Sequence, residues 1–162
     1  MVLRGLAWIA FAGCGGGDGE GGGGAGGTVE GSITADVDDE PRTFPLRSGV
    51  LYIVDVDDGA VRLGFTSFAG APCAVESWFE RGGDWAYTLV NTEDGMGELH
   101  FGLQEAGGFH GGFETVRAEL DLEVLEPAEG GGAVGTAAFF GFGDEPRGEA
   151  TFDVPFCGMQ AE

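Results

Sequence analysis

The sequence predicts one all-β domain over residues 28–162, an antiparallel β-sandwich or alternatively a small β-barrel of about eight or nine strands. Apolar residues recur at every second position through most of this stretch, which is the period of a strand with one buried face. Glycine-containing turn dipeptides separate the alternating runs. The length of the stretch suits a single hydrophobic core.

The clearest strand is expected at residues 116–124, where apolar and charged side chains alternate without a fault. On a helix Leu120, Leu122 and Val124 would spread over more than half of the circumference, whereas on a strand they share one face. Residues 50–56 are apolar at nearly every position, which indicates a strand buried on both faces. Further alternating runs predict strands at residues 29–37, 61–66, 85–89, 99–103 and 149–156.

Turn signals lie between these strands. Asp58-Gly59 is a strong hairpin signal, and Asp94-Gly95 separates the next two strands. A polar, glycine-containing segment at residues 143–148 separates the last two strands. Only residues 71–81 hint at a helix, of about two turns.

Residues 1–27 differ in composition from the domain. Arg4 precedes an apolar run that ends in small residues at position 13, which is the layout of a secretory signal. The run is far shorter than the roughly 20 residues that a membrane-spanning helix needs. Ten of the 13 residues at positions 15–27 are glycine, so this stretch has few side chains to bury and is expected to be a flexible tether. We therefore divide the chain into a signal at residues 1–13, a linker at residues 14–27 and the β domain.

Phe11-Ala12-Gly13-Cys14 resembles the lipobox of bacterial lipoproteins, typically Leu-Ala-Gly-Cys, with Phe11 in place of the usual leucine. The resemblance covers the first 14 residues and implies cleavage before Cys14, a lipid on its thiol and acylation of the new amino terminus. Two or more acyl chains give stable membrane anchoring. The plan of lipobox, glycine tether and β domain is also similar to uncharacterised envelope lipoproteins of high-GC bacteria. Because Gly15 rather than Asp follows the cysteine, the sorting rule of enteric bacteria implies the outer membrane.

The chain has two further cysteines, Cys73 and Cys157. If Cys14 carries lipid, these two form an even pair in an oxidising compartment, and we expect a disulfide between them. The alternative is two unpaired buried thiols. A disulfide would tie the last strand to the middle of the domain.

The formal net charge of −21 argues against nucleic acid as a partner, because phosphate backbones would be repelled. The same four letters, Asp-Val-Asp-Asp, occur at residues 36–39 and 55–58. Calcium takes six to eight oxygen ligands, so Asp55, Asp57 and Asp58 are candidate ligands for Ca²⁺, the one cofactor that we consider. The EF-hand pattern does not fit the residues that follow. A solvated acidic hairpin end is the simpler interpretation.

Several aromatic residues cluster between positions 78 and 87. Such rings could stack on sugars in a carbohydrate-binding module, but they more often belong to a core. Trp85 and Tyr87 share the inward face of a predicted strand, and Trp78, the least explained by packing, is a candidate for stacking on a ligand. His100 lies on the polar side of a predicted strand and His110 in a glycine-rich loop, and neither has metalloprotease spacing.

No catalytic motif is found in the sequence, such as Gly-x-Ser-x-Gly. The leading interpretation is therefore a lipid-anchored cell-envelope lipoprotein that is not an enzyme and has a structural or partner-binding role. It would reach the membrane through the lipid on Cys14 and could bind an envelope protein or a glycan. The alternatives are a calcium- or carbohydrate-binding β module and a hydrolase built on dispersed carboxylates.

Overall fold

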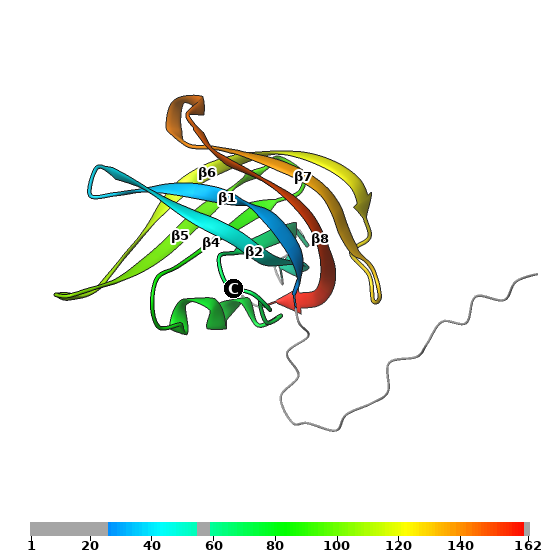
Figure 1. Cartoon of the computed structure of the whole chain (residues 1–162). Coiled ribbons are helices and arrows are strands. Elements are labelled where there is room, and N and C mark those ends of the chain that lie inside the picture. Colours follow the sequence, from blue (N-terminus) through cyan, green and yellow to red (C-terminus); the bar gives the residue numbers. More distant parts are fainter. Residues whose placement is uncertain (1–25, 55–58, 161–162) are drawn as a thin grey trace, which may run out of the picture.

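The computed structural model describes residues 26–54 and 59–160 of the chain. Eight strands form one sheet that closes on itself, and two short 3₁₀-helices connect strands (Figure 1). The all-β class and the expected number of strands are confirmed, with the strands in a single closed sheet rather than in two separate sheets. The elements are β1 (Gly27–Val37), β2 (Glu40–Val54), β3 (Val61–Thr66), η1 (Val75–Glu80), β4 (Trp85–Asn91), β5 (Met96–Glu105), β6 (Gly108–Leu125), β7 (Gly132–Phe140), η2 (Phe142–Asp144) and β8 (Pro146–Gln160).

Each strand pairs antiparallel with the next one in the chain, and β1 pairs antiparallel with β8 to close the ring. The end of β8 also runs parallel to the end of β2, with Leu51 opposite Phe156. Antiparallel neighbours need only short turns, which agrees with the turn dipeptides of the sequence. Among the described helices, none is long and apolar enough to cross a membrane.

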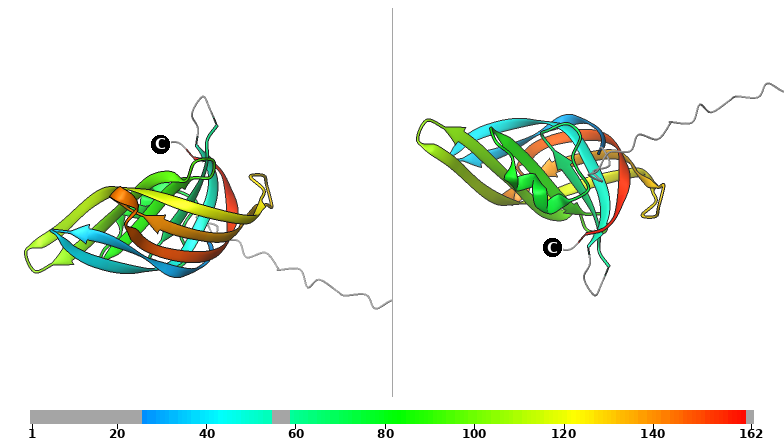
Figure 2. Two further views of the ribbon diagram at one scale, coloured as in Figure 1. Left: turned by 90° about the horizontal axis from the view of Figure 1, so that it is seen from above. Right: turned by 90° about the horizontal axis from the view of Figure 1, so that it is seen from below.

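The ring is uneven because its strands differ in length. β8 pairs with β1 only as far as Ile33, and β7 pairs with β6 only from Arg117 onward. Therefore, no described strand pairs with residues 34–37 on the β8 side of β1, and none pairs with residues 108–116 on the β7 side of β6. The distal parts of the β1–β2 and β5–β6 hairpins project as two arms from one end of the molecule (Figure 2).

The interior of the ring is filled by every second residue of the strands, as the alternation predicts. The Phe65 ring lies at its centre, 5.7 Å from the ring of Phe139 and 5.1 Å from that of Phe152. Burial decreases toward the end of β6, where Val124 is 39% exposed. The larger side chains with no exposed surface in this cluster include Ile33, Leu51, Leu63 and Leu99.

A second apolar cluster lies on the outer face of β2–β4, under the segment at residues 67–84 that contains η1. Within β2, Val50 and Val54 face this segment and Leu51 faces the interior, so the prediction of a strand buried on both faces is confirmed for its described part. Trp85 and Tyr87 are core residues, as expected, and the core to which they belong is this outer cluster rather than the interior of the ring. Alternation shows that two residues share a face, and the overlying segment determines which faces are covered.

The expected disulfide is present. Cys73 in the overlying segment is bonded to Cys157 in β8, with a Cα–Cα distance of 5.3 Å and a separation of 84 residues. The backbone N–H of Gly26 donates to the Ala71 carbonyl at 2.9 Å, so the described chain begins against the same segment. The start of β1, residues 71–73 of this segment and the end of β8 therefore lie together, away from the tips of the two arms (Figure 1).

We predict that the double variant Cys73→Ser/Cys157→Ser loses about 4 kcal/mol of unfolding free energy, because the disulfide restricts a long loop in the unfolded chain. Urea unfolding followed by tryptophan fluorescence measures this loss. Reductant should lower the stability of the wild type to that of the double variant and leave the double variant unchanged. Equal stability of the two proteins without reductant would contradict the prediction.

Candidate functional site

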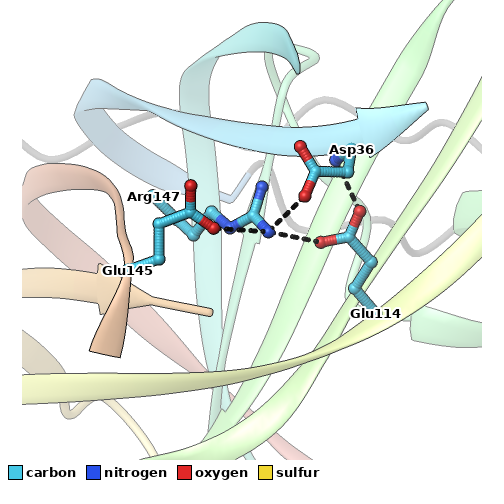
Figure 3. Close-up of polar contacts among 4 residues, drawn as sticks. All are labelled: Asp36, Glu114, Glu145 and Arg147. Atoms are coloured by element: carbon cyan, nitrogen blue, oxygen red, sulfur yellow. Dashed lines mark hydrogen bonds and ion pairs between the residues drawn. The ribbon is translucent and has the colours of Figure 1, made fainter. Parts of the chain in front are cut away.

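One candidate site is a buried arginine in the seam between β1 and β6. Arg147, near the start of β8, points into this seam (Figure 3). Its Nη2 donates to Asp36 Oδ2 at 2.5 Å and lies 3.3 Å from Glu145 Oε2 and 3.7 Å from Glu114 Oε2. Asp36 belongs to β1, Glu114 to β6, and Glu145 precedes β8. The Arg147 guanidinium thus joins β1 and β6 at positions where no described strand pairs with the facing edges of these two strands.

The side chains around Arg147 also replace part of the missing backbone pairing. The Asp36 N–H donates to Glu114 Oε1 at 2.5 Å, so a carboxylate oxygen takes the place of a strand carbonyl. The Arg147 side chain is only 8% exposed and lies over Gly141, where a Cβ would come within 2.5 Å of Nε. Its Nε has no hydrogen-bond partner in the part of the chain that the structure describes.

Of the three carboxylates around Arg147, Asp36 and Glu114 have pKa values shifted in opposite directions. The hydrogen bond from Arg147 lowers the pKa of Asp36. Burial raises the pKa of Glu114, and the hydrogen bond from Asp36 and the charge of Arg147 offset only part of this effect. Carboxylate pairs of this kind occur in acid–base catalysis. Here both Glu114 oxygens face groups of the protein itself, so the role that the geometry supports is closure of the seam.

The second candidate site is a stack of five rings on the outer face of β4–β6, which we call the aromatic face. It consists of Trp85, Tyr87, His100, Phe109 and Phe113. The centroid distances along the stack are 5.8 Å for Phe113–His100, 4.8 Å for His100–Tyr87, 5.6 Å for Tyr87–Trp85 and 6.1 Å for Trp85–Phe109. The two end rings are exposed, Phe109 by 58% and Phe113 by 69%. Exposed apolar groups gathered in this way are typical of interaction surfaces.

Polar groups border the aromatic face. His100 Nε2 lies 2.9 Å from Glu98 Oε2. Burial and the charge of Glu98 raise the pKa of Tyr87. Beside Glu98, a surface hollow of about 410 Å³ is lined by Leu89, Gly97 and Met96 among other residues. The face therefore combines flat apolar rings with hydrogen-bonding groups, which suits an amphipathic ligand better than a purely apolar one.

The residues singled out in the sequence have different outcomes. Cys14 and the candidate calcium ligands Asp55, Asp57 and Asp58 lie outside the described residues. Trp78 has no exposed surface, and its Nε1 donates to the Pro72 carbonyl at 2.9 Å. Its ring tip occupies the space above Gly64, so packing explains Trp78 and it is not free to stack on a ligand.

The histidines also differ from the expectation. His100 is not an isolated surface residue, because it stands between two rings of the aromatic face with a side-chain exposure of 26%. His110 belongs to β6 rather than to a loop, and its Nε2 lies 3.6 Å from Asp38 Oδ2. Within the described ranges, no group of three or more His, Cys, Asp or Glu side chains is arranged to hold a metal ion.

Sequence reasoning missed the two exposed ends of the aromatic face. The signal was present, because Phe109 and Phe113 flank Gly111 at period two, as on one face of a strand. The neighbouring glycines favoured a loop instead. The chain matches no protein-family model, no curated protein and no solved structure. Its function is therefore argued from its own residues.

We predict that Asp36→Asn and Glu114→Gln have different effects on stability at pH 7. The lowered pKa of Asp36 means that its ionised form stabilises the fold, so Asp36→Asn should reduce the unfolding free energy. The raised pKa of Glu114 means that its ionised form is disfavoured, so Glu114→Gln should leave the unfolding free energy unchanged or raise it. Urea unfolding of the matched pair measures both effects.

The pH dependence separates the two groups further. The Asp36 contribution is present above its unfolded pKa of about 3.9 and is lost as the pH falls through its lower folded pKa, so the Asp36→Asn variant should converge with the wild type in acid. The gain from Glu114→Gln should appear as the pH rises through the folded pKa of Glu114. A larger loss for Glu114→Gln than for Asp36→Asn at pH 7 would contradict this assignment.

Proposed function

We propose that this protein is a lipid-anchored lipoprotein of the cell envelope that binds a partner through the aromatic face and is not an enzyme. The observation that carries the binding role is an ordered stack of aromatic rings that reaches solvent at both ends, at Phe113 and at the Phe109 ring over Trp85. Exposed aromatic rings of this kind are enriched at binding interfaces, where they contribute large contact areas.

The lipid anchor is supported by the cysteines. Cys73 and Cys157 are paired, which suits a protein of an oxidising compartment. Cys14, the remaining cysteine, follows Phe11-Ala12-Gly13, and together these four residues resemble a lipobox. Lipid on Cys14 would attach the protein to a membrane, and the outer membrane is the one we expect.

The geometry of the domain suits this attachment. The described chain enters β1 beside the segment at residues 67–84, whereas the tip of the β5–β6 hairpin lies at the opposite end (Figure 1). Phe109 lies near that tip, at the second position of β6. An anchor that precedes residue 26 would therefore leave the arms and the aromatic face directed away from the attachment point.

A glycan is the partner that the aromatic face favours over an envelope protein, because stacked rings and neighbouring polar groups match the apolar faces and hydroxyls of sugars. Nucleic acid is not expected as a partner, because the net charge is −21. Calcium binding at Asp55, Asp57 and Asp58 stays a prediction from the sequence.

We predict that the wild type, expressed in a bacterium that processes lipoproteins, fractionates with membranes, and that Cys14→Ser moves to the aqueous fraction. Intact mass should show loss of residues 1–13 and added acyl chains on the wild type. The Cys73→Ser/Cys157→Ser variant is the matched control and should stay with the membranes. Full-length wild type with Met1 and without lipid in the aqueous fraction would overturn the proposed anchor.

A further inference from the structure

The indole N–H of Trp85 is a buried donor without an acceptor among the described residues. The residue is 6% exposed, and one face of its ring is packed against Tyr87 at an interplanar angle of 12°. An unpaired buried donor costs free energy, and in most proteins such groups find a partner. Trp85 belongs to the aromatic face, so a ligand that binds there could supply the missing acceptor.

Phe109 covers the Nε1 end of Trp85. A Cβ on Gly102 would lie 2.5 Å from Phe109 Cζ and 2.6 Å from Trp85 Cε2, the ring carbon bonded to Nε1. The Phe109 ring also lies over Gly111, where a Cβ would come within 2.9 Å of it. The Phe109 ring therefore lies over Gly102 and Gly111, and the surface beneath it consists of backbone atoms without side chains, which we call the glycine floor.

Phe109 is the ring in this contact that has freedom to move. It is 58% exposed and follows Gly108, whose φ of +123° favours glycine, directly after the hairpin turn. No described strand pairs with the outer edge of β6 at this position. Trp85, in contrast, is 6% exposed, and its ring is stacked on that of Tyr87 on the side away from Phe109. Rotation of Phe109 would uncover one face of Trp85, its N–H and the glycine floor together.

We propose that Phe109 covers a subsite for a pyranose ring of a neutral glycan, in which the sugar takes the place of the Phe109 ring on Trp85. The apolar C–H face of the sugar would stack on the indole, and a sugar oxygen would accept the hydrogen bond from Nε1. A purely apolar ligand would leave this donor unpaired, and the net charge of −21 disfavours an anionic one.

Polar groups beside the subsite suit the remaining hydroxyls. Gln104 lies opposite Phe109 in the β5–β6 ladder and carries a side-chain amide on the same face. Its backbone N–H donates to Asp84 Oδ1 at 2.8 Å, which places a carboxylate next to this end of β5. The subsite rests on the proposed binding role of the aromatic face and is independent of the lipid anchor.

Isothermal titration of the full-length chain with cellohexaose and with chitohexaose tests the proposal, because both are neutral and have pyranose rings with flat C–H faces. We expect at least one to bind with a Kd below about 1 mM. Trp85→Phe keeps a ring but removes the N–H donor and should weaken binding about tenfold. Phe109→Ala removes the ring that the sugar must displace and should therefore bind several-fold more tightly than the wild type.

Phe142→Ala is the matched control, because Phe142 is 99% exposed and lies in η2, outside the aromatic face. Its affinity should equal that of the wild type. The glycan subsite is overturned if neither sugar binds the wild type or Phe109→Ala, or if Trp85→Phe binds like the wild type. Equal or weaker binding by Phe109→Ala would overturn the role of Phe109 as a cover. Membrane fractionation of Cys14→Ser reports on the lipid anchor separately.

Discussion

The structure depends on closing a sheet whose strands have unequal lengths. Backbone groups at an unpaired edge need partners, and an open edge exposes them. Between β1 and β6 the partners are side chains, because Glu114 accepts the Asp36 N–H and Arg147 bridges the carboxylates of both strands. Arginine suits this place because its guanidinium remains charged, and its Nη2 alone lies within 3.7 Å of three carboxylates. Farther out along the arms, His110 Nε2 lies 3.6 Å from Asp38 Oδ2 and adds a second polar contact between them.

The same unequal lengths divide the outer surface into two parts. The segment at residues 67–84 covers β2–β4 and is attached to β8 by the Cys73–Cys157 disulfide, so this part of the surface becomes a second core. Beyond that cover, the outer face of the β5–β6 arm stays open. The ring stack lies partly in each region, so Trp85 and Tyr87 are buried and held in place while Phe109 and Phe113 meet solvent. Because Trp85 and Tyr87 are fixed by packing, a flat ligand that stacks on them costs little of their side-chain freedom.

Much of the fold could be predicted from local pattern. The alternation at residues 116–124 and 149–156 and the turn at Asp94-Gly95 all appear as expected. The start of β6 was missed, because Gly111 and Gly112 resemble a loop, although their missing side chains leave room for the rings of Phe109 and Phe101. The packing of Trp78 was also not foreseen, because Trp78 lies in η1 and Gly64, on which its ring packs, lies in β3 and becomes its neighbour only in the folded chain.

The sequence by itself determined the strand character of the domain and the positions of several turns, because these follow from spacing along the chain. It predicted the pairing of Cys73 with Cys157 only on the assumption that Cys14 carries lipid, and the structure shows the bond. Only the tertiary structure decided which sheet faces are covered, where the ring needs Arg147 and which aromatic rings meet. These features depend on contacts between residues far apart in the chain, such as Asp36 and Arg147, which lie 111 positions apart. A period of two assigns side chains to one face or the other, and only the packing of distant segments determines whether that face becomes core or surface.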